Sequence, residues 1–296
     1  MQSSGQMLRD MLDGGSLERS EKALIKKVAE SPDDIGLLHR FADVLRQRGK
    51  LREAGTVYSR IRKLQPTDPA AGALGALLRG RRVPDAAPLP TKFLIESDFL
   101  ENERIEEIRT LVRNQRDEFA PTEVLDASGK QEMDTDTRCS ESLTNLRGVT
   151  EWFPDRVAKL VPELRKRLRV PRFRAGLHSI KISAYHHGHF FGLHHDDNAG
   201  AAASRRFGFI YYFEFPPKRF SGGELILFDR DPDSLLPTAS FTNLAPDHNI
   251  LVIIPANTWH AVLPIHCPSE DWFAGRFTLS GWIHDDDMLA AHQRTA

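Results

Sequence analysis

The sequence has few cysteines, no long apolar run and almost no net charge. Its 296 residues include only two cysteines, Cys139 and Cys267, which cannot form a disulfide framework and lack the clustering of a zinc–thiolate site. Scarce cysteine is typical of a reducing compartment, and Met1 to Arg19 has no signal-peptide core. We therefore predict a cytoplasmic location.

No apolar run approaches the roughly 20 residues that a membrane-spanning helix needs. The 40 Lys and Arg residues balance the 41 Asp and Glu residues, which argues against a general nucleic-acid or membrane-surface binder. We expect neither nucleic acid nor membrane as a partner. The length favours two domains over one, and either domain could bury a core.

The N-terminal third has the apolar spacing of helices, with Gly49 between two stripes and Pro66 after the second. The stripes are Leu38, Phe41, Ala42 and Leu45, followed by Ala54, Tyr58 and Ile61. From residue 38 onward these positions resemble a tetratricopeptide repeat. We predict a helical, tetratricopeptide-like region over residues 1–83, which either caps the following domain or binds a peptide or protein partner. The prolines of residues 84–90 predict a linker, and residues 91–296 would form a second domain.

Five histidines and two adjacent carboxylates lie between Tyr185 and Asp197. Strand side chains two residues apart share a face, so His194 pairs with Asp196, and His195 pairs with Asp197 on the opposite face. A His-x-Asp pair with a distant histidine is the two-His-one-carboxylate arrangement of non-haem Fe(II) oxygenases. Spacing alone does not choose between the two pairs. The distant histidine has a candidate in His260, which ends a run of buried-strand type.

Arg276 begins the last strand-like pattern of the chain. By alternation it shares a face with Thr278, Ser280 and Trp282. A lone arginine is more often part of a surface ion pair, but a position after His260 in a strand-rich region favours another role. A guanidinium beside hydroxyls suits a carboxylate, because arginine presents two parallel N–H donors. A metal site with a carboxylate clamp indicates a 2-oxo acid as co-substrate.

Short strands without intervening helices follow residue 179 and predict a double-sheet jelly roll rather than a parallel α/β sheet. We expect strands over 179–185, 207–214, 221–229, 249–255 and 276–284, after helices over 102–116 and 150–169. The predicted fold class is α+β: a double-stranded β-helix domain, which is a cupin-like jelly roll, preceded by a small all-α region.

Several motifs of the second region occur together. They are Tyr185-x-x-Gly188 followed by His194-x-Asp196, Arg205-Arg-Phe-Gly, Gly222-Gly-Glu224, and Ile254-Pro255 before His260. Over roughly residues 91–284 the sequence resembles the prolyl 4-hydroxylase-type branch of the Fe(II)/2-oxoglutarate dioxygenases. The interval between His260 and Arg276 is longer than is usual in that family.

The resemblance fixes the register at Tyr185 and Gly188 and implies Fe(II) held by His194, Asp196 and His260. It implies that Arg276 binds the far carboxylate of 2-oxoglutarate, with help from two residues, Tyr185 and Thr278. O2 would be the other co-substrate, and ascorbate a reductant.

The implied activity is hydroxylation of an unactivated C–H bond with release of succinate and CO2. A peptidyl residue, proline first, is the expected substrate, and a free amino acid or peptide natural product is the second possibility. An alternative of another class is a helical-repeat adaptor with a catalytically inactive jelly roll. The oligomeric state stays open, as does the choice between substrate contact and packing for His186, His187, His189 and His195.

Overall fold

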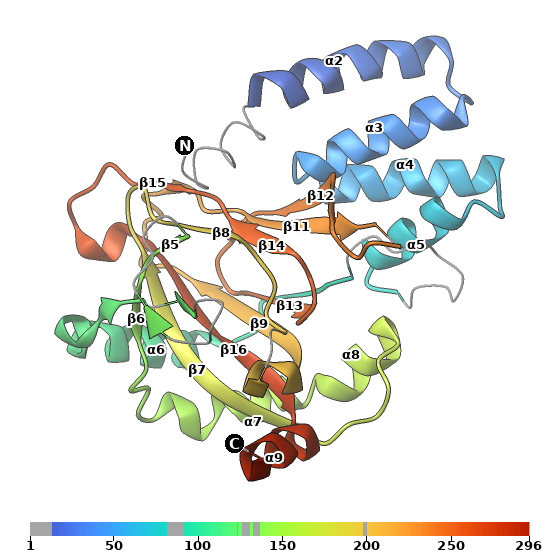
Figure 1. The fold of residues 1–296 in the computed structure, drawn as a ribbon. Coiled ribbons are helices and arrows are strands. Elements are labelled where there is room, and N and C mark those ends of the chain that lie inside the picture. The colour runs from blue at the N-terminus through green and yellow to red at the C-terminus, as the bar shows by residue number, and fades with distance from the viewer. Residues whose placement is uncertain are drawn as a thin grey trace.

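The computed structural model describes residues 14–81, 92–122, 124–125, 131–132, 137–197, 200–231 and 233–295. Figure 1 shows four N-terminal helices beside an antiparallel β-sandwich with further helices around it. The predicted fold class, a helical region followed by a jelly-roll sandwich, is confirmed. The predicted linker over residues 84–90 lies outside the described residues.

The N-terminal helices follow the predicted apolar stripes. They are α2 (Gly14–Glu30), α3 (Ile35–Gln47), α4 (Leu51–Leu64) and α5 (Pro69–Leu77). Asp34 and Asp68 begin α3 and α5, because each carboxylate accepts a backbone N–H of the first turn, at 2.9 and 2.7 Å. Both stripes pack into one small core, in which Leu38, Ala54 and Tyr58 are fully buried or nearly so.

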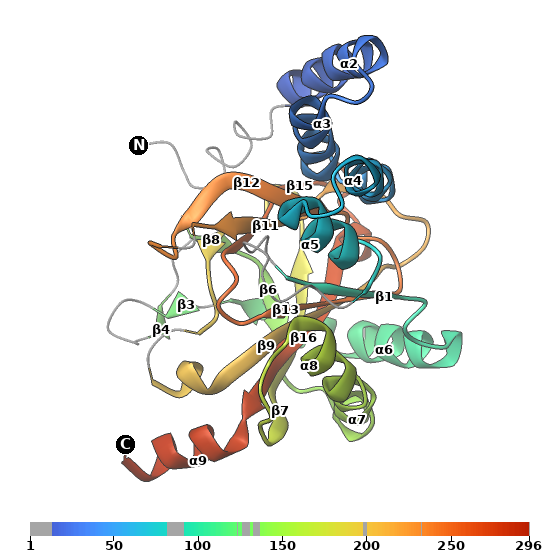
Figure 2. The same cartoon turned by 90° about the vertical axis from the view of Figure 1, so that its right-hand side faces the viewer.

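A seven-stranded antiparallel sheet forms the larger layer of the sandwich, in the order β1-β13-β9-β16-β7-β6-β2. Its strands are β1 (Leu94–Ser97), β2 (Ala120–Pro121), β6 (Glu141–Leu143), β7 (Ala175–Tyr185), β9 (Arg205–Phe213), β13 (Ile250–Pro255) and β16 (Arg276–Asp285). Three helices pack their apolar side chains into one core with this sheet and cover its outer face (Figure 2). They are α6 (Asn102–Asn114), α7 (Phe153–Ala158) and α8 (Val161–Leu168).

A five-stranded sheet, in the order β12-β11-β14-β8-β5, forms the second layer. Its strands are β5 (Arg138–Cys139), β8 (Phe190–His194), β11 (Leu225–Arg230), β12 (Pro237–Leu244) and β14 (His260–Val262). Two short strand pairs join β3 (Val124–Leu125) to β4 (Gln131–Glu132) and β10 (Ser221–Gly222) to β15 (Ile265–His266). A second core, which includes Tyr212, Leu227 and Ile254, fills the space between the layers.

The prediction of one helix over residues 150–169 was wrong. The chain forms α7 and α8 with a break at Lys159 and Leu160. Pro162 has no N–H to continue the hydrogen-bond ladder of α7, whereas it fits the first turn of α8. The described residues also form a last helix that the sequence had not indicated, α9 (Asp286–Thr295).

Arg46 of α3 attaches the helical region to the five-stranded sheet. Its side chain is only 2% exposed, and its two terminal nitrogens lie 3.1 and 2.8 Å from the carboxylate oxygens of Asp229, in β11. The same guanidinium donates to Thr242 and Ser240 of β12. Because this charge is buried and paired, the contact fixes α3 against the β11–β12 edge.

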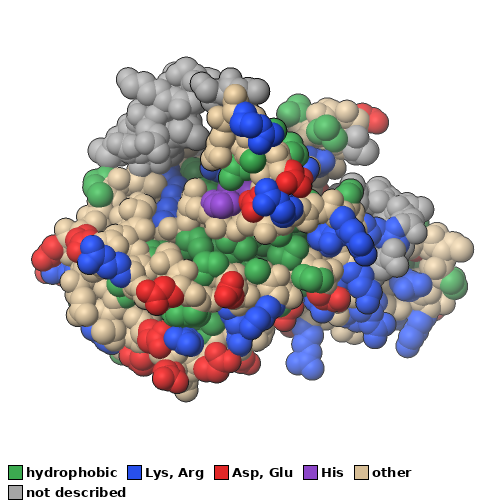
Figure 3. Space-filling view, turned by 90° about the horizontal axis from the view of Figure 1, so that it is seen from below, with side chains coloured by type: hydrophobic (Ala, Val, Ile, Leu, Met, Phe, Trp, Pro, Cys, Tyr) green, Lys and Arg blue, Asp and Glu red, His purple; other side chains and the backbone are tan. Residues whose placement is uncertain are grey.

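Charge is unevenly distributed over the surface. On the face shown in Figure 3, Lys and Arg side chains gather towards the right, and Asp and Glu side chains gather at the left and lower edges. On this face the two signs of charge are therefore partly separated. Among the helices of the described residues, none has the length and apolar character that crossing a bilayer requires.

Candidate metal and co-substrate site

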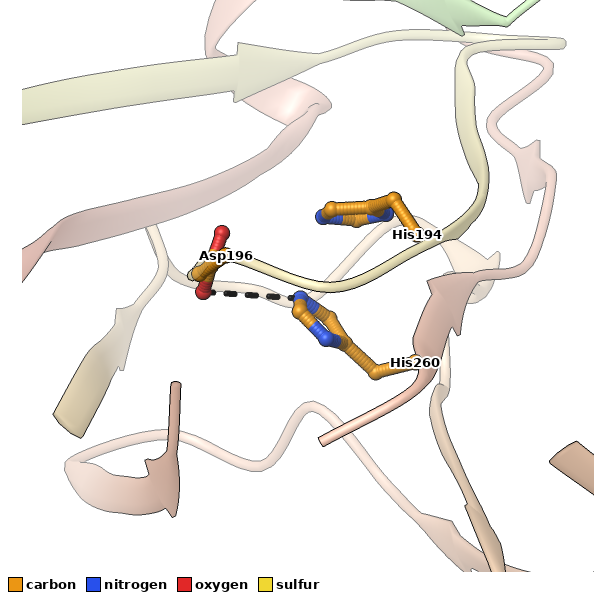
Figure 4. Close-up of side chains that lie close together, drawn as sticks. All are labelled: His194, Asp196 and His260. Atoms are coloured by element: carbon orange, nitrogen blue, oxygen red, sulfur yellow. Dashed lines mark ion pairs between the residues drawn. The ribbon is translucent and has the colours of Figure 1, made fainter. Parts of the chain in front are cut away.

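The structure brings His194, Asp196 and His260 together between the two layers. His194 ends β8 and lies directly opposite His260, which begins the neighbouring antiparallel strand β14. The two imidazole centroids are 4.0 Å apart, and Nε2 of His260 is 3.9 Å from Oδ2 of Asp196 (Figure 4). One nitrogen or oxygen atom from each residue lies within 4.8 Å of the other two. This arrangement can hold one metal ion.

Both imidazoles are oriented by their backbone. Nδ1 of His194 lies 2.8 Å from the carbonyl oxygen of Gly192, and Nδ1 of His260 lies 2.8 Å from that of Thr258. A carbonyl only accepts, so Nδ1 carries the proton in each ring and Nε2 keeps its lone pair. Burial, together with the neighbouring His260, holds the pKa of His194 well below its usual range. The neutral imidazole that results is the form that binds metals.

The alternative pair, His195 and Asp197, is not part of this group. Nδ1 of His195 lies 2.6 Å from Oδ1 of Asp197, so the two side chains bind each other. The ring of His195 packs edge-on against Trp259, with centroids 4.5 Å apart. Of the two pairs that the spacing left open, only His194 and Asp196 converge with His260.

Arg276 lies in the same pocket, on the opposite layer. Its side chain is 2% exposed, and its guanidinium carbon lies 4.6 and 5.0 Å from the ring centroids of Tyr185 and Tyr212. Within the described chain its Nε and Nη1 atoms are buried without a hydrogen-bond partner. An unpaired buried charge is costly, so these donors are suited to an anionic ligand.

Thr278 and Tyr185 lie in the same pocket as Arg276. Both are buried, and both line the pocket with Arg276, which pairs with Tyr185 across β16 and β7. The pocket also reaches His194, Asp196 and His260. All six predicted site residues therefore face one cavity.

Two glycines leave space that this site requires. A Cβ on Gly208 would lie 3.0 Å from Oδ2 of Asp196. A Cβ on Gly223 would lie 2.8 Å from Cδ of Arg276 and 2.1 Å from Cδ1 of Ile265, and the φ of Gly223 is +72°. Any larger residue at 223 would displace Arg276.

The sequence reasoning missed several polar residues at the pocket. Lys181, Ser183 and Arg138 line it, and Arg205 donates from Nη1 to the backbone oxygen of Asp196 at 3.0 Å. Strand alternation could have found Lys181 and Ser183, since they share a face with Tyr185. Arg138 lies on a two-residue strand, which has no such pattern.

The other three histidines of the motif lie outside the pocket lining. His186 and His189 pack against each other, with centroids 5.3 Å apart, and His186 also contacts Trp272. Nδ1 of His187 accepts from the backbone N–H of Cys267. These contacts favour packing roles.

The chemistry of this pocket can be compared with known proteins. A family model described as the 2OG-Fe(II) oxygenase superfamily matches residues 180–284, the stretch that carries the three convergent side chains and Arg276. This stretch matches a 2OG-Fe(II) oxygenase domain. An uncharacterized PKHD-type hydroxylase of Synechocystis sp. is 29% identical over 140 residues, which cover 47% of this chain and 46% of the relative. The match thus spans about half the length of that relative.

The fold of the 2OG-Fe(II) oxygenase domain also occurs in solved structures. A prolyl hydroxylase from Trichoplax adhaerens, in complex with a peptide fragment of the hypoxia inducible factor oxygen degradation domain, aligns with a TM-score of 0.50 and 16% identity. The alignment covers 82% of this chain and 95% of that one. At this identity the likeness concerns the fold alone.

Proposed function

We propose that this protein is an Fe(II)- and 2-oxoglutarate-dependent dioxygenase that hydroxylates an unactivated C–H bond, with release of succinate and CO2. The observation that carries the proposal is the buried guanidinium of Arg276, whose Nε and Nη1 lack a hydrogen-bond partner among the described residues, in one cavity with His194, Asp196 and His260. The fold alone explains neither the buried guanidinium nor the convergence of the two histidines and the aspartate. A metal ion and a dicarboxylate co-substrate would satisfy both.

The three convergent residues would hold Fe(II) through Nε2 of His194, Nε2 of His260 and the carboxylate of Asp196. When bound, Fe(II) supplies open coordination positions for the 2-oxo acid and O2. The Nδ1–H bonds to Gly192 and Thr258 keep both imidazoles in the tautomer that binds metal.

Arg276 would bind the far carboxylate of 2-oxoglutarate with its fork of N–H donors, and Thr278 would add a hydroxyl donor. Tyr185 and Tyr212 pack on the guanidinium and fix its direction. Apolar side chains complete the walls and exclude water from the reacting groups. They are Phe191, Ile210, Ile254 and Val262.

The first candidate substrate is a peptidyl residue, with proline first. Three observations support it: the prolyl 4-hydroxylase-type motifs, the hydroxylase fold, and the N-terminal helices, which could contact a polypeptide. A free amino acid is the second candidate. A tetratricopeptide-like role of the helices, ascorbate as reductant and a cytoplasmic location stay predictions.

The direct test is 2-oxoglutarate turnover by the purified full chain. Anaerobic protein with Fe(II) and 2-oxoglutarate should develop the visible absorption of a chelated 2-oxo acid, and O2 should then produce succinate. His194→Ala should abolish both, whereas His195→Ala, one residue away, should retain both. Absence of the absorption and of succinate in the wild-type protein would favour the alternative, an inactive adaptor.

A further inference from the structure

Lys181 has no ion-pair partner among the described residues. It lies on β7, and its side chain lines the pocket between the layers. No described residue forms a hydrogen bond or an ion pair with its ammonium group. The ammonium lies over the ring of Trp282, and Nζ is 5.9 Å from the ring centroid. A lysine in such surroundings has a strong preference for an anionic partner.

Arg205 lies on the other side of the same tryptophan. Its guanidinium carbon is 3.7 Å from the centroid of the Trp282 ring, and its Nε is buried without a hydrogen-bond partner in the described chain. Since β7 and β9 are the two neighbours of β16, Lys181 and Arg205 reach Trp282 from opposite sides. Arg205 is also hydrogen-bonded to the backbone of Asp196, so this pair of cations borders the proposed metal position.

The charges of the pocket do not balance. Asp196 is the only carboxylate that lines it among the described residues, against Arg138, Lys181 and Arg276. The charges of Fe(II) and 2-oxoglutarate cancel each other. Arg276 would bind the far carboxylate of 2-oxoglutarate. Burial, together with the nearby Arg138 and Arg205, lowers the pKa of Lys181 to about 7, although Asp196 opposes the shift. The cations beside Trp282 therefore lack an anion even when both cofactors are counted.

We infer that the substrate carries a carboxylate close to the C–H bond that reacts, and that Lys181 and Arg205 bind this carboxylate at Trp282. The inference rests on the proposed function and narrows its substrate. It favours a free amino acid, or the C-terminal residue of a peptide, over a residue inside a polypeptide. An internal residue has no carboxylate of its own backbone at this position.

The test compares acids with their amides. The full chain is loaded with Mn(II) and 2-oxoglutarate, which gives a complex without turnover, and is titrated calorimetrically with the common L-amino acids, with Gly-Pro, and with the amide of each. At least one free acid should bind, and its amide should bind at least about tenfold more weakly, because charge-assisted hydrogen bonds are lost. Binding of amides as tightly as acids, or of no acid at all, overturns the inference.

Variants identify the groups responsible. Lys181→Met should weaken the acid about tenfold and leave the amide unchanged, and Lys181→Arg should keep most of the preference for the acid. Arg205→Met provides a second variant with the same expected loss. The control is Lys166→Met, on the exposed side of α8, which should change neither affinity.

Two further measurements separate the possible failures. If Lys181→Met weakens 2-oxoglutarate binding as much as Arg276→Met does, Lys181 serves the co-substrate and the inference is wrong. If the wild-type protein turns over 2-oxoglutarate but does not distinguish acids from amides, the carboxylate site is wrong and the dioxygenase stands. If the wild-type protein neither binds nor turns over 2-oxoglutarate, the proposed function itself has failed.

Discussion

His194 and His260 are direct partners across β8 and β14, and each donates its Nδ1–H to the carbonyl two residues before it. The pairing places both imidazoles beside Asp196. Side chains that are already oriented lose little conformational entropy when they bind a metal ion. The affinity for the metal should therefore depend steeply on each of the three side chains.

We expect Asp196→Ala and His260→Ala to lower the affinity for Mn(II) or Co(II) at least about tenfold, since each removes a coordinating atom. Calorimetric titration of the metal-free protein measures this directly. The matched control is Asp197→Ala, because Asp197 is bonded to His195 and is not part of the group. Equal losses in both variants would contradict the assignment of the ligands.

Arg276→Met should separate co-substrate binding from stability. It removes the donors proposed for the far carboxylate, so the affinity for 2-oxoglutarate should fall about 100-fold, as expected for two charge-assisted hydrogen bonds. It also removes a buried charge whose Nε and Nη1 lack partners among the described residues, so the free energy of unfolding of the metal-free protein should stay equal or rise. The measurements are a 2-oxoglutarate titration and a urea transition. A large loss of stability with unchanged affinity would show that Arg276 is structural.

The contact between α3 and the five-stranded sheet should contribute strongly to stability. Asp229→Ala leaves the buried Arg46 guanidinium with only the more exposed Asp43, 3.7 Å away, and should lower the free energy of unfolding by about 3 kcal/mol. The control is Asp33→Ala, which breaks the exposed ion pair between Asp33 and Arg60 and should cost about 1 kcal/mol or less. Urea unfolding compares the two. Similar small effects would show that the helices are not held by this pair.

The stability of the metal-free protein should depend on Lys181 above neutral pH. Its folded-state pKa, about 7, is lower than the ordinary value of 10.5, so between these values the unfolded chain binds the extra proton. Stability attributable to Lys181 therefore rises with pH from about 7 towards 10, by at most about 1.4 kcal/mol per pH unit. Urea transitions in EDTA at pH 7, 8 and 9 should show this rise in the wild-type protein relative to Lys181→Met. Parallel curves for the two proteins would mean that the ammonium is solvated.

The sequence was sufficient where a short periodicity or a local motif determines the outcome. Alternation along β16 correctly placed Arg276 and Thr278 on one face, and the buried-strand pattern before His260 located the distant histidine. Alternation could not choose between two overlapping His-x-Asp pairs, because both satisfy it. The choice between the pairs depends on which histidine lies opposite His260 of β14. That pairing is a tertiary contact.

Other features depend on residues far apart in the chain. The pairing of Arg46 with Asp229 joins positions 183 residues apart, and no local pattern predicts it. Lys181 and Arg205, the cations at Trp282, come from β7 and β9. Both strands are neighbours of β16, and this follows only from the strand order of the folded sheet. The division of one expected helix into α7 and α8 was visible in Pro162, but the apolar spacing obscured it.

The two histidines belong to one layer of the sandwich and Arg276 to the other. The separation of the layers therefore fixes how long a diacid can be if it is to touch both the metal and the guanidinium. We therefore expect a four-carbon oxo acid such as oxaloacetate, and a six-carbon homologue, to bind more weakly than 2-oxoglutarate. Co-substrate chain length is thus a property of interlayer packing, and substitutions in the core between the sheets should change it without touching any ligand-binding residue.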